Sequence, residues 1–247
     1  MNSVALLRAH TRVQFLDLLR WPGYVVPTVL FPAMFYALFA LPFARTRAEA
    51  ADLTTLAFMA FAIVGVTLYQ FGVGIAQERG RPWERYNRTL PVSAGVRFGA
   101  RIVTAVLFGF LTAAIVALVA RAFTPIDLTA VQWLRVAIYS LAGGVPFVLI
   151  GITIGYWTSA RAAVPIATAL NLLLAYGGGL WMPPQELPRV VAAISPCLPT
   201  RQFADLLWSV TTGADATHAL AGLVAYAALF AAAAALGYRR DERTRYA

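Results

Sequence analysis

Six apolar runs of about twenty residues each limit what this chain can fold into. A run of that length crosses a hydrocarbon core of about 30 Å as a helix, whereas a soluble core helix does not need it. The composition agrees, because 60% of the 247 residues are hydrophobic and only 13% are charged. We therefore predict an all-α integral membrane protein with one transmembrane domain, residues 1–247, and spans at about residues 24–43, 53–76, 98–120, 131–157, 162–182 and 217–238.

The arginines lie at the ends of these runs and predict how the chain is oriented. Cytoplasmic loops of membrane proteins carry an excess of basic residues. With both termini on one side, that side holds fourteen arginines and the other side six, and the chain has no lysine. We therefore expect both termini in the cytoplasm. The net charge of +9 then serves membrane orientation and contact with lipid, and not nucleic-acid binding.

Residues 3–20 precede the first span and predict a helix of their own. Val4, Leu7, Thr11, Phe15 and Leu18 fall on one helical face, although other apolar residues fall off it. We expect an amphipathic helix lying in the cytoplasmic interface. The alternative is an ordinary cytoplasmic start to the first span. Charge is interleaved with the apolar residues, so the stretch does not read as a cleavable signal peptide.

Residues 183–210, between the fifth and sixth spans, form a second segment that does not cross. Its apolar pieces are too short to span, and its prolines exclude one continuous helix. We expect a re-entrant or surface-lying helical segment on the extracellular face, with a floppy loop as the alternative. The prolines are Pro183, Pro184, Pro188, Pro196 and Pro199.

The chain shows no catalytic or metal-binding motif. It lacks HExxH, GxSxG and Walker A sequences, its two histidines are far apart, and Cys197 is its single cysteine. Ion-coupled carriers need ionisable groups at membrane depth, and the span interiors nearly lack them. Gln70 and Asn171 are polar exceptions, which could line a substrate path or bond a neighbouring helix. We predict no catalytic residue, no metal and no cofactor bound by this chain.

Gly151 and Gly155 of the fourth span have the GxxxG spacing that permits close helix approach. We interpret this face as packing inside the bundle, and a dimer contact is the alternative.

The loop 77–97 between the second and third spans carries more than the arginines that orientation requires. Its core reads QERGRPWERYNRTLP. Pro82 suits the first position of a helix and Pro91 stands where a short helix should have ended, so we predict a helix of about two turns. Tryptophan, tyrosine and arginine are enriched at binding hot spots. The loop could therefore dock another protein, or anchor on lipid headgroups.

Two segments in this order resemble one known family. ER followed by WERYNRTLPVS, from Glu78, resembles the loop after the second span in permeases of the ABC-2 transporter family. PPQELPRVVAAISPCLPTRQFADLLWSV resembles that family's proline-rich segment before the last span. The N-terminal helix, six spans and cytoplasmic termini also agree. Arg81-Pro82-Trp83 depart from the family's commonest form, which has Gly-Thr before the acid.

The resemblance implies the membrane-spanning subunit of an ATP-binding cassette exporter in a bacterial plasma membrane. Two permeases, identical or related, would form a pathway for a hydrophobic or amphipathic substrate such as a drug, antibiotic, lipid or glycan. Separate ATPase subunits would bind ATP and Mg and dock on the loop, the family's coupling helix. Independently of the resemblance, the outer end of the fifth span, with Gly177, Gly178, Gly179 and Trp181, and the segment 183–210 with its five prolines are candidates for an extracellular gate, and an ordinary helix end is the alternative role of the glycines. A lipid-modifying membrane enzyme and a secondary carrier are the alternatives. The docking residues carried over are Glu78, Arg79, Arg81, Trp83, Glu84, Arg85 and Tyr86.

Overall fold

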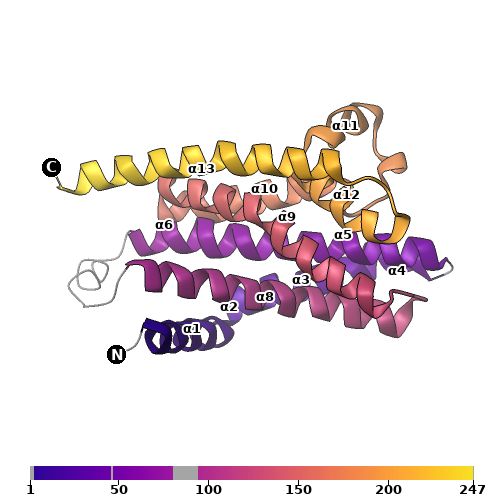
Figure 1. Cartoon of the computed structure of the whole chain (residues 1–247), viewed down its shortest axis with the longest axis horizontal. Coiled ribbons are helices and arrows are strands. Elements are labelled where there is room, and N and C mark those ends of the chain that lie inside the picture. Colours follow the sequence, from indigo (N-terminus) through magenta and orange to yellow (C-terminus); the bar gives the residue numbers. More distant parts are fainter. Residues whose placement is uncertain (1–2, 46, 80–93, 247) are drawn as a thin grey trace.

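The computed structural model describes residues 3–45, 47–79 and 94–246. Throughout these ranges the regular elements are helices, and no strand occurs in them. The long helices run roughly parallel or antiparallel to one another (Figure 1). The prediction of an all-α membrane protein is confirmed.

Six stretches of the described chain are long and apolar enough to cross a membrane. The first span joins α2 (Pro22–Val25), α3 (Phe31–Phe35) and α4 (Leu41–Ala44) through two π-helical segments, η1 (Val26–Leu30) and η2 (Tyr36–Ala40). The second joins α5 (Ala48–Thr67), the π-helical η3 (Leu68–Val73) and α6 (Gly74–Arg79). The others are α8 (Ala94–Phe123), α9 (Ala130–Trp157), α10 (Ala160–Gly177) and α13 (Thr217–Tyr246).

Two of these spans end five or more residues away from the end that the sequence predicted. Helix α10 ends at Gly177, five residues early, because Gly179 adopts a φ of 73° that breaks the helical path. Helix α13 runs to Tyr246, eight residues beyond the apolar run, so its last turns are built from charged residues.

The second span is the centre of the bundle. Its apolar stretch is 89% buried, compared with 17% for α13 at the edge. Helix α5 contacts α8, α9 and α12. Phe58 and Phe71 are fully buried on this span. Any movement of the second span therefore has to displace several neighbours.

Helix α1 (Ser3–Leu19) packs along α8, and the predicted apolar face points that way. The Phe15 and Phe108 rings are 4.8 Å apart, and a Leu7 methyl lies against Gly99. Val4, which we placed on the same face, is exposed, as are Val13 and Leu16. That α1 lies in the membrane interface stays a prediction.

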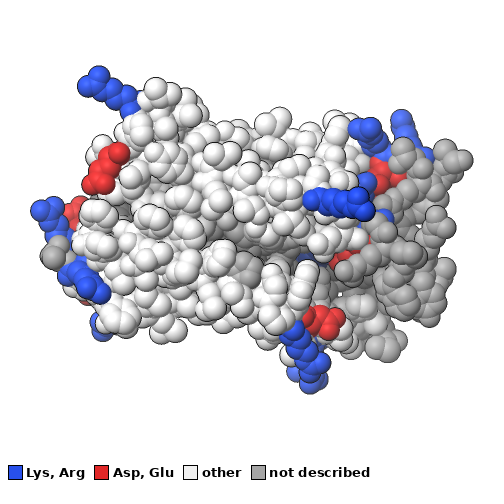
Figure 2. Space-filling model, turned by 180° about the vertical axis from the view of Figure 1, so that it is seen from behind, with Lys and Arg blue, Asp and Glu red and all other residues white. Residues whose placement is uncertain are grey.

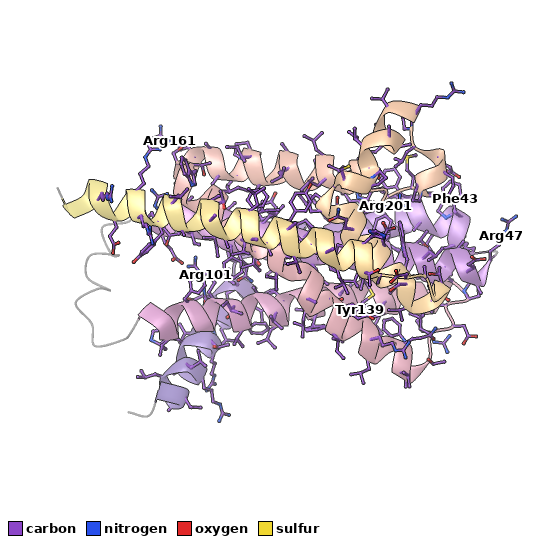
Figure 3. The ribbon with its side chains drawn as sticks, turned by 45° about the horizontal axis from the view of Figure 1, so that its top comes forward. Phe43, Arg47, Arg101, Tyr139, Arg161 and Arg201 are labelled. Atoms are coloured by element: carbon purple, nitrogen blue, oxygen red, sulfur yellow. The ribbon has the colours of Figure 1, made fainter. Side chains whose placement is uncertain are left out.

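Charged side chains gather at the two ends of the molecule and leave an uncharged belt between them (Figure 2). Arg101 and Arg161 lie toward the end that carries both termini, while Arg47 and Arg201 lie toward the opposite end (Figure 3). A belt without charge is what a hydrocarbon core requires. The chain is a multi-pass membrane protein.

The segment before α13 is helical in short pieces. They are the 3₁₀ turn η4 (Pro184–Glu186), α11 (Arg189–Ile194), the 3₁₀ turn η5 (Ser195–Cys197) and α12 (Pro199–Thr212). The prolines stand at starts and breaks, and Pro199 opens α12. Helix α12 is part of the bundle: Trp208 Nε1 donates to the Leu53 carbonyl oxygen at 2.8 Å.

The GxxxG face of α9 is used inside the bundle. A Cβ on Gly151 would lie 2.9 Å from Phe71 Cβ, and one on Gly155 would lie 2.7 Å from Ile75 Cβ. The small residues therefore let α9 approach η3 and α6 closely.

Candidate functional site

The root of the predicted docking loop lies at the end of the bundle where both termini lie (Figure 1). Glu78 and Arg79 close α6, and α8 begins at Ala94 on the far side of the loop. Of the predicted docking residues, Arg81, Trp83, Glu84, Arg85 and Tyr86 lie outside the described residues.

Glu78 forms an ion pair with Arg101 of α8. Arg101 is only 7% exposed, although it is a charged residue near the end of a span. The pair connects α6 to α8, the two helices that flank residues 80–93. The flanks of the loop are thus held to one another by this ion pair.

Arg79 is bound to two further spans. Its Nε and Nη2 donate to Oδ1 of Asp241 on α13 at 3.0 and 2.5 Å, and its Nη1 donates to the Gly155 carbonyl oxygen on α9 at 2.6 Å. Asp241 is 8% exposed. A buried carboxylate without such partners would be costly. The two residues that end α6 together reach α8, α9 and α13.

Gln70 and Asn171 are both buried, on η3 and α10. Gln70 Nε2 and Asn171 Oδ1 have no hydrogen-bond partner among the described residues. Asn171 faces α5, because a Cβ on Gly65 would lie 3.3 Å from its Nδ2. A hydrogen bond between the hydroxyls of Tyr69 and Thr168, at 2.5 Å, joins η3 to α10.

An aromatic cluster stands beside the prolines of the predicted gate. The Trp181 ring stacks on Phe35 at 5.3 Å and on Phe39 at 6.2 Å, and meets Phe61 edge-on at 5.6 Å. It joins the first span, α5 and the turn after α10. The Trp181 Nε1 atom is buried without a partner in the described part of the chain.

An apolar cleft of about 240 Å³ lies between α8 and α9, over α5 and η3. Its polar lining residues are Thr67 and Ser140. Its rim includes Leu141 and Val145, each 48% exposed. Its other lining side chains are aliphatic or aromatic, or are glycines.

Sequence reasoning missed Arg101, Asp241 and the cleft. Arg101 and Asp241 are charged residues near span ends, a common position in membrane proteins. Nothing in one sequence shows that Arg79 meets a residue 162 positions away. The aromatic cluster was anticipated only through Trp181, which we placed at the outer end of the fifth span.

Comparison with known proteins identifies what this architecture is similar to. The family described as "ABC-2 type transporter" matches residues 5–212. The chain is 28% identical over 171 residues to "Putative transport permease YvfS" of Bacillus subtilis (strain 168), covering 69% of this chain and 70% of that protein. No solved structure matches.

Proposed function

The chain belongs to the ABC-2 type transporter family, and we propose that it is the membrane-spanning subunit of an ATP-driven exporter. It is a membrane transport subunit, and not an enzyme in its own right. Separate ATP-binding cassette subunits, which hold ATP and Mg, dock on residues 77–91. The chain lies in a bacterial plasma membrane with both termini in the cytoplasm. A second permease, identical or related, completes the pathway.

The placement of the loop carries this proposal. Its two flanks leave the bundle at the end that carries the termini, and Glu78 and Arg101 hold them together. The second span, which leads to the loop, is the most buried of the six candidate spans in the described chain. A partner that moves the loop therefore moves the centre of the bundle.

The interior favours a hydrophobic or amphipathic substrate. Among the described residues, the buried side chains that carry a charge at neutral pH are Arg101 and Asp241, and both lie toward the loop end. The clefts and faces at membrane depth are lined by aliphatic and aromatic groups. Such a surface selects by shape and apolar area.

The rival functions have less support. A secondary carrier couples transport to ions through ionisable groups at membrane depth, and the described spans bury no Asp, Glu, His or Arg apart from Arg101 and Asp241. A lipid-modifying enzyme needs a cluster of acids, histidines or a metal. No group of three or more His, Cys, Asp or Glu that could hold a metal occurs in the part of the chain that was described.

The test is purification of the chain from its native membrane. We expect a cassette ATPase to co-purify with the parent chain, and to be lost when residues 81–88 are replaced by glycine and serine. Replacing residues 213–216, the connection on the opposite end, is the matched control and should keep the ATPase. If no ATPase accompanies the parent chain, the proposed function is wrong.

A second variant separates docking from coupling. Charge reversal of Glu84 and Arg85 is expected to stop export while the chain still inserts in the membrane. Normal export by both reversals would place the coupling contacts elsewhere in the loop.

A further inference from the structure

Arg79 is the last described residue before residues 80–93, and its side chain bonds to two other spans. Two of its nitrogens donate to Asp241 Oδ1, and the third donates to the Gly155 carbonyl oxygen at 2.6 Å. Its guanidinium carbon also lies 5.4 Å from the centre of the Tyr156 ring. A planar guanidinium with several bonded donors has little freedom to turn. Its position is therefore fixed relative to α9 and α13 as well as α6.

The last turns of α13 are fastened to the end of α9 by further contacts. Trp157 Nε1 donates to the Ala233 carbonyl oxygen at 3.0 Å, and the Arg240 guanidinium lies 5.5 Å from the Trp157 ring centre. The Tyr156 and Tyr238 rings meet edge-on at 5.6 Å. These contacts hold the C-terminal half of α13 against the end of α9.

Helix α13 lies outside the stretch that matches the family. The match ends at residue 212 and α13 begins at Thr217. Its charged turns extend past the apolar run, and crossing the membrane does not require them. Asp241 is nevertheless buried there, at 8% exposure, against the root of the loop. Burying a carboxylate costs solvation free energy, and the bonds from Arg79 offset that cost.

We propose that Arg79 and Asp241 form a clamp that carries movement of the loop to α9 and α13. The inference rests on the proposed function, because an ATPase must first move the loop. Asp241 is then a positioning residue: it holds Arg79 and does not touch the ATPase or the substrate. The C-terminal helix becomes part of the coupling route.

The geometry makes two substitutions informative. Asp241→Asn keeps the size of the side chain but removes the charge that holds Arg79. Arg79→Lys keeps a cation for Asp241 but replaces three nitrogens in a fixed plane with one. It should fold even if Asp241→Asn does not. Asp215→Asn is the matched control, since it makes the same change on an exposed residue just before the opposite end of α13.

The experiment measures nucleotide-dependent movement of α13. In a Cys197→Ser background, Arg243→Cys places one thiol on an exposed position of α13. The complex with the co-purifying ATPase is labelled with a maleimide, without nucleotide and after trapping with ATP and vanadate. We expect the two labelling rates to differ at least about twofold in the parent and with Asp215→Asn. The ratio should fall to about one with Asp241→Asn, while the ATPase still co-purifies, and to an intermediate value with Arg79→Lys.

The outcomes separate the clamp from the function on which it rests. Parent-like ratios in both Arg79→Lys and Asp241→Asn, or equal rates in the parent complex, overturn the clamp and leave the permease assignment standing. Failure of any ATPase to co-purify with the parent overturns the proposed function, and the clamp with it. Loss of the ratio together with normal ATPase binding supports the clamp, because a purely structural bond would change folding or docking instead.

Discussion

Gly151 of α9 shows how little space separates the central spans. A Cβ there would lie 2.9 Å from Phe71 Cβ and 3.0 Å from the Thr67 carbonyl oxygen, which cannot rotate away. We expect Gly151→Ala to lower the free energy of unfolding by about 1–3 kcal/mol, the range for overpacked cores. Thermal unfolding in detergent measures the change.

Gly109 of α8 is the control for this substitution. A Cβ there would meet only Ile63 Cγ1, at 3.9 Å. Gly109→Ala should therefore be neutral or stabilising, since alanine favours helix by about 1 kcal/mol over glycine. Equal effects at both positions would show that the α9 approach to η3 is looser than described.

Asn171 is a residue for which the sequence left two roles open. Its Oδ1 is buried without a partner among the described residues, so substitution removes no hydrogen bond from that atom. Replacing an unsatisfied polar group by an apolar one of similar size is close to neutral. We expect the free energy of unfolding of Asn171→Leu to differ from that of the parent by less than about 0.5 kcal/mol in the same detergent assay. A loss above about 1 kcal/mol would instead assign Asn171 to bonding a neighbouring helix.

Helix α12 illustrates an element that was predicted only in part. The five prolines correctly excluded a single continuous helix over 183–210. They could not show that α12 is inserted among α5, α9 and α13, since that depends on a complementary surface. The surface is supplied by Gly143, where a Cβ would lie 2.2 Å from the Phe203 ring. The pairing of Gly143 with Phe203 spans 60 positions and leaves no periodic signal in the sequence.

This packing makes α12 a structural part of the bundle. Phe203 is fully buried and its ring lies 5.8 Å from that of Phe147. We expect Phe203→Ala to lower the free energy of unfolding by about 3–5 kcal/mol, because the surrounding helices cannot close the cavity that the ring leaves. Val190→Ala on α11, where the side chain is 77% exposed, should change stability by less than about 0.5 kcal/mol. Thermal unfolding of the two variants in one detergent compares them directly, and similar losses would mean that α12 does not pack as a core element.

The molecule as a whole was predicted more fully than its site. Hydrophobic length is a local property, so the six spans could be read from single runs of sequence. Contacts between spans are not local: Arg79 with Asp241 and Glu78 with Arg101 each pair charges that a sequence shows only as span-end residues. The docking loop was predicted from Trp83, its bracketing prolines and the family resemblance, and these residues lie outside the described part of the chain, so the docking role stays a prediction.

The orientation of the molecule is a prediction that the native cysteine can test. Cys197 is exposed, on η5 at the end opposite the termini. The arginine count places that end outside the cell, with fourteen arginines on the side of the termini. A membrane-impermeant maleimide should therefore label Cys197 in intact spheroplasts.

In a Cys197→Ser background, Arg243→Cys on α13 should be labelled only after the membrane is opened. A permeant maleimide should label both thiols throughout, which controls for accessibility. The reverse labelling pattern would show that the termini lie outside the cell. The connection between α6 and α8 would then be out of reach of a cytoplasmic ATPase.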